Sequence, residues 1–217
     1  MKLEIKKNLI GVLAMVGLIW LIYLINIPLG VTSWDFRNWG LQPRTTSGLV
    51  GVFTMPFLHR DMNHILSNTV PLTVLLFMLR ASRRTPWRIL VSLIVGSGVL
   101  LWCFGRSQIH VGASVLIYSL AAYLIAAGIY ERKPIAIIIS VLVAVMYGAL
   151  FWGLLPTAGE SVSWEGHLFG AVFGGVFAHF TLRRREEGTK TVVAPQPVEA
   201  KMTEVKVPEV TVNGDGI

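Results

Sequence analysis

Six apolar runs follow one another along the sequence, and they constrain the fold more than any other feature. Several of the runs approach the roughly 20 residues that a helix needs to cross the hydrocarbon core of a bilayer. Only 14% of the residues are charged, whereas a typical soluble domain carries about 25%. The sequence therefore predicts an all-α membrane protein, a bundle of six transmembrane helices. We expect these helices at about residues 9–27, 65–78, 89–104, 114–130, 135–155 and 167–182.

The distribution of basic residues predicts the orientation of this bundle. If the N-terminus is inside, only four of the 19 lysines and arginines lie on the outer side: Arg37, Arg44, Arg60 and Arg106. Basic residues gather in cytoplasmic loops, so both termini are expected in the cytoplasm, in a multi-pass protein of a bacterial plasma membrane. The clusters are short and lie at helix ends, so the net charge of +7 indicates no nucleic-acid partner.

The composition also divides the chain into two parts. Residues 1–185 carry the apolar runs and form the expected membrane domain, whereas residues 186–217 are rich in Pro, Val, Lys and Glu without a lasting period. Such a segment is expected to be a disordered cytoplasmic tail. Residues 31–58 form a long connection with many aromatic side chains, which favours a place at the membrane interface.

Three polar residues are predicted at one depth in this membrane domain. His64, Ser114 and His167 each lie near the start of an apolar run, about 25 Å above the basic residues that end it, at 1.5 Å of rise per residue. Polar side chains at such a depth face protein or a water-filled cavity and usually serve a function. A serine beside a histidine is the minimum set for nucleophilic attack on an amide.

The fourth run is short, so its helix must begin below the membrane surface and residues 105–113 must dip into the membrane. This loop delivers Ser114 to a helix N-terminus, where free backbone N–H groups and the helix dipole favour a developing negative charge. Gly112 gives the backbone the freedom for a tight approach. The alternative is that Ser114 serves only as an N-cap.

The sixth run supplies a partner for this serine. His167 shares a helix face with Gly170 and Gly174, and glycines on one face let another helix come very close. If that neighbour is the fourth helix, His167 can reach Ser114. The alternative is that the glycines serve packing only.

The second run supplies hydrogen-bond donors, and it spans a bilayer only if its helix begins near Asp61. His64 and Asn68 share a helix face and can both donate to an oxyanion. The alternative is that they join helices by hydrogen bonds. His59 lies outside the span, where it can anchor the long connection.

Metal chemistry is not expected from this sequence. Five histidines suffice in number for a zinc site, but the chain lacks the His-Glu-x-x-His helix of membrane zinc proteases and has no carboxylate within its spans. Its sole cysteine, Cys103, rules out a cysteine-based site. We expect no metal and no cofactor.

Taken together, three motifs resemble the rhomboid intramembrane serine proteases: His59-x4-His64-x3-Asn68, Gly112-x-Ser114-x3-Tyr118, and Gly166-His167-x2-Gly170-x3-Gly174. The resemblance implies a six-helix rhomboid-like bundle with Ser114 as nucleophile and His167 as general base and acid. It implies an oxyanion hole of His64, Asn68 and the Ser114 backbone N–H, with Tyr118 packed against the His167 ring. It also implies single-span membrane proteins as substrates, cut where their helix unwinds.

The chain departs from the family pattern at three places. Val115 follows the nucleophile where the family often has glycine, and Gly166 precedes the histidine where alanine is common. The long connection has no clear Trp-Arg pair, for which Arg37 and Trp39 are partial substitutes. We therefore expect Val115 to crowd the oxyanion side and the long connection to dock differently from that of the family.

The acidic residues indicate a dyad rather than a triad. Glu165 precedes His167 by two residues and so points elsewhere on the helix, which leaves Tyr118 to orient the imidazole. A catalytically inactive adaptor that binds transmembrane helices is the alternative to a protease. A small transporter or channel would predict charges inside the spans or inverted repeats, and neither is visible. The sequence gives neither the substrate nor the oligomeric state.

Overall fold

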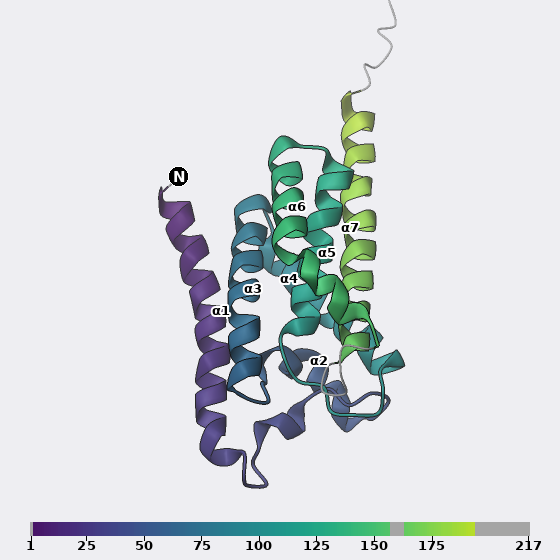
Figure 1. Ribbon diagram of the computed structural model, residues 1–217. Coiled ribbons are helices and arrows are strands. Elements are labelled where there is room, and N and C mark those ends of the chain that lie inside the picture. Colours follow the sequence, from purple (N-terminus) through teal and green to yellow (C-terminus); the bar gives the residue numbers. More distant parts are fainter. Residues whose placement is uncertain (1, 157–162, 194–217) are drawn as a thin grey trace, which may run out of the picture.

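The computed structural model describes residues 2–156 and 163–193, which form helices joined by turns and loops (Figure 1). Within these residues the only β-type pairing is an isolated antiparallel bridge between Leu41 and His110. The α-helices are α1 (Lys2–Leu29), α2 (Gly51–Thr54), α3 (Met62–Ser82), α4 (Pro86–Phe104), α5 (Ser114–Glu131), α6 (Pro134–Tyr147) and α7 (Trp164–Val193). Four 3-10 helices lie between them: η1 (Phe36–Trp39), η2 (Ser47–Leu49), η3 (Met55–Phe57) and η4 (Gly148–Leu154).

The protein is a helical membrane protein. Among the described residues, four helices are long and apolar enough to cross a bilayer, namely α1 over Leu9–Leu29, α3, α4 and α5. Shorter apolar helices occupy Ser47–Phe57 and Pro134–Tyr147. The count of six spans and the cytoplasmic side of both termini stay predictions.

The start of α3 satisfies the condition that the sequence sets for a full span. Asp61 is its N-cap, and the Asp61 carboxylate accepts a 2.9 Å hydrogen bond from the His64 backbone N–H. Such a cap satisfies one of the free donors in the first turn. The helix therefore begins early enough to reach 21 residues.

The predicted fifth helix is wrong in its second half. The α-helix α6 ends at Tyr147, and the chain continues as the 3-10 helix η4. Gly148 and Gly153 bracket this stretch, and glycine weakens an α-helix by about 1 kcal/mol relative to alanine. The tighter 3-10 winding brings Gly153 against Tyr118 and His167, where a Cβ would collide with the Tyr118 hydroxyl.

Helix α5 occupies the centre of the bundle, with α7, α6 and α4 around it (Figure 1). Its closest neighbour is α7, because Gly170 and Gly174 sit directly on its backbone. A Cβ on Gly170 would collide with the Val115 carbonyl oxygen, and one on Gly174 with that of Ser119. The predicted glycine face therefore packs on the helix that begins with Ser114. By contrast, α1 stands at the edge beside α3 with many exposed apolar side chains.

The connection between α1 and α3 is held at several points. Arg37 pairs with Asp35 and donates to the carbonyl oxygens of Gly30 and Arg60, at 3.1 and 3.3 Å. Arg44 donates to the Gly105 carbonyl at 2.7 Å. Arg37 thus ties the end of α1 to the start of α3 although no clear Trp-Arg pair is present.

The predicted division at residue 185 falls inside a helix. Helix α7 continues past this position to Val193. The rest of the predicted tail, residues 194–217, lies outside the described residues.

Candidate active site

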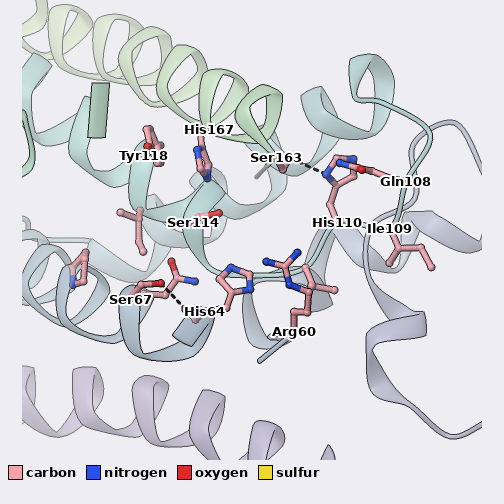
Figure 2. Close-up of a pocket in the computed structure, with 14 residues that line it drawn as sticks. Arg60, His64, Ser67, Gln108, Ile109, His110, Ser114, Tyr118, Ser163 and His167 are labelled. Atoms are coloured by element: carbon pink, nitrogen blue, oxygen red, sulfur yellow. Dashed lines mark hydrogen bonds between the residues drawn. The ribbon is translucent and has the colours of Figure 1, made fainter. Parts of the chain in front are cut away.

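A cavity of about 370 Å³ opens at the end of the bundle where α5 begins. Figure 2 shows that side chains from α3, α5, α7 and the loop before α5 converge on it. Five of the predicted site residues are among the residues that line it: Ser114, His167, His64, Asn68 and Tyr118. The remaining lining residues are Arg60, Ser67, Pro71, Gln108, Ile109, His110, Val111, Ile117 and Ser163.

Ser114 is the first residue of α5 and not its cap. The N-cap is the fully buried Ala113, and no side chain caps this helix end. The backbone N–H groups of the first turn therefore lack intrahelical acceptors at the cavity. The N-cap reading of Ser114 is wrong, and its hydroxyl is not engaged in capping.

Gly112 brings the nucleophile loop onto α3. Its φ of +118° is a conformation that residues with a Cβ rarely adopt. A Cβ there would also lie 2.6 Å from Cε1 and Nε2 of His64. Glycine is thus required twice over at this position, for the turn and for the approach to the His64 ring.

His167 is held by two contacts, and its second ring nitrogen has no hydrogen-bond partner among the described residues. Its Nδ1 lies 2.9 Å from the Gly153 carbonyl oxygen, and its ring stacks on Tyr118 with centroids 4.1 Å apart and planes 7° apart. A carbonyl only accepts, so Nδ1 carries the proton and Nε2 presents its lone pair. The predicted contact with Tyr118 is present. Sequence reasoning missed Gly153, since a backbone carbonyl in an expected helix gives no signal.

Ser114 and His167 face the same cavity (Figure 2). The residues that the structure describes include no hydrogen bond between their side chains. Catalytic hydrogen bonds are often long in substrate-free enzymes and shorten when substrate binds. The arrangement is therefore compatible with proton transfer from Ser114 Oγ to His167 Nε2.

The donors on α3 have no partner in the described part of the chain. Nδ1 of His64 and Nδ2 of Asn68 are buried there without a hydrogen bond, although Asn68 is only 6% exposed. The alternative that these side chains join helices would require partners. An unmatched buried donor costs about 1–3 kcal/mol, so both groups are suited to an acceptor that a substrate supplies.

His59 lies behind this pair as a buried neutral group. Its ring meets the His64 ring edge-on, with centroids 5.1 Å apart. Burial is the main cause that lowers the pKa of His59 to about 4, with His64 as a second cause. His59 therefore packs against the His64 ring as a buried neighbour.

The first two departures from the family pattern compensate each other. Val115 is buried against Leu41, Met55 and Leu101 and does not line the cavity, so it leaves the oxyanion side open. A Cβ on Gly166 would lie 3.0 Å from the Val115 methyl group Cγ2. The larger residue after the serine thus occupies the space that a smaller residue before the histidine leaves.

A second polar cluster joins the segments that carry Ser114 and His167, and sequence reasoning missed it. Arg106 forms an ion pair with Glu165 at 2.7 Å, and His110 Nδ1 lies 2.8 Å from Ser163 Oγ. A signal was available, because Arg106 and Glu165 are opposite charges on two segments expected to meet. Glu165 pairs with Arg106, and among the described residues no hydrogen bond joins it to His167.

No metal site is evident in the described ranges. Within residues 2–156 and 163–193, no group of three or more His, Cys, Asp or Glu side chains is placed to hold an ion. The histidines near the cavity instead contact one another, backbone or serine.

Comparison with known proteins agrees with the fold and the motifs. The family model of the rhomboid domain matches residues 46–184. Proteins of Mycobacterium tuberculosis and Mycobacterium bovis, each named only as uncharacterized, are 36% identical to the chain over 178 residues, which is 77% of this chain and 72% of theirs. An uncharacterized protein of Mycobacterium leprae is 30% identical over 194 residues, 85% of this chain and 76% of its own. No solved structure matches the chain.

Proposed function

This chain belongs to the rhomboid family, and on that premise we propose that it is an intramembrane serine protease. It cleaves single-span membrane proteins near the outer face of the membrane, through a Ser114–His167 dyad. The mycobacterial relatives favour a bacterial plasma membrane. One observation carries the proposal: one cavity gathers a serine at a helix N-terminus, a histidine, and two donors on α3, and within residues 2–156 and 163–193 the second histidine nitrogen and both donors have no hydrogen-bond partner.

The first chemical step is acylation of the serine. Ser114 Oγ attacks the carbonyl carbon of the substrate peptide, and its proton passes to Nε2 of His167. The negative charge on the former carbonyl oxygen is stabilised by the Ser114 backbone N–H, His64 and Asn68. The C–N bond then breaks, and His167 returns the proton to the leaving amine. An acyl ester on Ser114 remains.

The second step is hydrolysis of this ester. His167 takes a proton from a water molecule, whose oxygen attacks the acyl carbon, and the same three donors stabilise the second oxyanion. The C–O bond to Ser114 breaks, and the proton on His167 returns to Ser114 Oγ. The cavity admits this water because polar atoms line it in an otherwise apolar bundle.

The orienting group for the base is a backbone carbonyl instead of a carboxylate. Gly153 fixes the tautomer of His167 through Nδ1, and Tyr118 holds the plane of the ring. A neutral carbonyl stabilises the imidazolium less than a buried carboxylate does. We therefore expect turnover to be slow relative to soluble serine proteases.

A fluorophosphonate probe tests the proposal. We expect the probe to label the purified wild-type protein in detergent, and Ser114→Ala and His167→Ala to remain unlabelled. Ser67→Ala is the matched control, because Ser67 also lines the cavity but donates to the His64 carbonyl at 2.9 Å. Labelling that persists in Ser114→Ala would refute the nucleophile. A folded wild-type protein that stays unlabelled would favour an inactive adaptor that binds transmembrane helices.

A further inference from the structure

The segments that carry the nucleophile and the base are joined by more than helix packing. Four residues form a polar cluster between them, which we call the latch: Arg106 and His110 in the loop before α5, and Ser163 and Glu165 at the start of α7. Figure 2 shows the His110–Ser163 contact in the wall of the cavity that Ser114 and His167 also line. His110 and Glu165 are only 3% and 4% exposed.

The histidine half of the latch has a defined direction of hydrogen bonding. His110 Nε2 lies 3.1 Å from the Arg106 carbonyl oxygen, which can only accept, so Nε2 carries the proton. Nδ1 therefore accepts from the Ser163 hydroxyl. Ser163 Oγ in turn accepts a hydrogen bond from the Gly166 backbone N–H at 3.3 Å. The Ser163 carbonyl oxygen accepts a second one from the His167 backbone N–H at 3.1 Å. His110 is thus linked to the helical turn that carries the base.

The ion-pair half of the latch is held by two side-chain contacts. Arg106 Nε and Nη2 donate to the two oxygens of Glu165 at 2.7 and 3.0 Å. The Arg106 backbone N–H reaches the same carboxylate at 3.4 Å. Paired donation of this kind fixes geometry as well as adding energy. Glu165 precedes His167 by two residues, so a shift of this carboxylate moves the first turn of α7.

The latch also includes the first long connection. Leu41 and His110 exchange backbone hydrogen bonds of 2.9 and 2.8 Å, the isolated bridge of the fold. The loop from Gly105 to Ala113 has no regular secondary structure of its own beyond this bridge. Its position therefore depends on contacts with its neighbours, and its last residues lead directly to Ser114.

We propose that His110 and Glu165 are positioning residues, which hold Ser114 within reach of His167 by tying the nucleophile loop to the first turn of α7. This role rests on the proposed protease function. A displacement of about 1 Å between reacting groups can lower the rate about 100-fold. Such a role predicts an effect on kcat with little effect on KM.

The first experiment measures kcat and KM on a single-span substrate in proteoliposomes. We expect His110→Phe and Glu165→Ala to lower kcat about 10- to 100-fold while KM stays within about threefold of the wild-type value. His110→Gln and Glu165→Gln should recover part of kcat, because an amide can replace some of the hydrogen bonds. Two controls match these changes away from the cavity: His179→Phe in α7, and Asp35→Ala in the ion pair with Arg37.

The second experiment does not depend on activity. Hydrogen exchange of backbone amides should become faster in the loop 105–113 and in the first turn of α7 in His110→Phe and Glu165→Ala, and stay unchanged there in both controls. Unchanged hydrogen exchange in His110→Phe and Glu165→Ala, or a kcat equal to that of the wild type, would contradict the proposed positioning role of the latch. If the wild-type protein cleaves no substrate, the protease function is refuted instead. The hydrogen-exchange data would still show whether the latch holds the loop 105–113 to the first turn of α7.

Discussion

The two ends of α5 differ in whether the polar side chains around them are paired. At its C-terminal end, Glu131 pairs with Arg83 at 2.7 Å, and the two side chains are only 13% and 6% exposed. The Arg83 guanidinium also lies over the Tyr123 ring, 5.4 Å from its centroid. At the N-terminal end, donors of His64 and Asn68 have no partner among the described residues and surround a cavity beside Ser114.

This difference distinguishes a structural polar site from a functional one. At the C-terminal end two opposite charges meet inside the protein, so they stabilise the bundle as a pair, although Arg83 Nε has no acceptor among the described residues. At the N-terminal end the donors remain unmatched at a cost of about 1–3 kcal/mol each. Such a cost is expected where the missing acceptor arrives with a substrate. Substitutions at the two ends should therefore affect different quantities.

The largest effect on stability is expected at the C-terminal end. Arg83→Ala leaves the Glu131 carboxylate, which is 13% exposed, without this partner, and this should lower the free energy of unfolding by about 3 kcal/mol, the lower end of the range for buried pairs. Activity per folded molecule should stay near the wild-type value, because the pair lies at the opposite end of α5 from Ser114. Reversible unfolding in mixed detergent micelles measures the first quantity, and active-site titration normalises the second. A loss of activity without a loss of stability would break the comparison.

Asn68→Ala should show the opposite pattern. Removal of one oxyanion donor lowers kcat about 100- to 1000-fold in serine proteases. Stability should be unchanged or higher, because the substitution removes a buried donor without a partner. The measurement is kcat for a single-span substrate together with the unfolding midpoint, with Ser67→Ala as the neighbouring control. If Asn68→Ala keeps the wild-type kcat, Asn68 is not a donor of the oxyanion hole.

Gly166→Ala tests the space between α5 and α7 beside the base. The added methyl group would meet Val115 Cγ2 at 3.0 Å and Ser163 Oγ at 2.7 Å, and overpacking of this kind costs about 1–3 kcal/mol. A second change, Val115→Ala, should relieve part of the cost. A double-mutant cycle on the unfolding free energy measures this coupling. Additive effects would show that the two residues do not share this space.

The smallest predicted effect is a pH dependence that arises at the cavity end. The pKa of His59 is lowered to about 4, mainly by burial, from about 6.5 in an unfolded chain. The unfolded state thus binds the proton more tightly, so stability is retained above pH 6.5 and falls as the pH drops from about 6.5 toward 4. We expect a loss of about 1 kcal/mol between about pH 7.5 and 5.5. His59→Leu should flatten this slope, and an unchanged slope would contradict the assignment.

The sequence predicted those parts of the fold that follow from apolar length and local pattern. The start of α5 at Ser114, a start of α3 near Asp61 and the packing of Gly170 and Gly174 on α5 are confirmed. These features depend on neighbours in sequence or on one helix face, so a periodic pattern reveals them. The roles of the site residues stay predictions, although the structure brings Ser114, His167, His64 and Asn68 to one cavity.

Contacts between distant segments could not be predicted in the same way. The carbonyl of Gly153 reaches His167 only because the chain leaves the α-helix after Tyr147. The larger Val115 side chain fills the space left by Gly166 only because α5 and α7 approach each other closely. The first case depends on a backbone atom and the second on the absence of a side chain. Neither feature changes the hydropathy or charge pattern of the sequence.

The central claim is that Ser114 acts as a nucleophile on a peptide bond within the membrane. Its most direct test is cleavage of a purified single-span substrate in proteoliposomes, by the wild-type protein and by Ser114→Ala. We predict two defined fragments with the wild-type protein and intact substrate with the variant, while both proteins unfold at similar detergent concentrations. Equal cleavage by the two proteins, or none by a folded wild-type protein, would contradict the account.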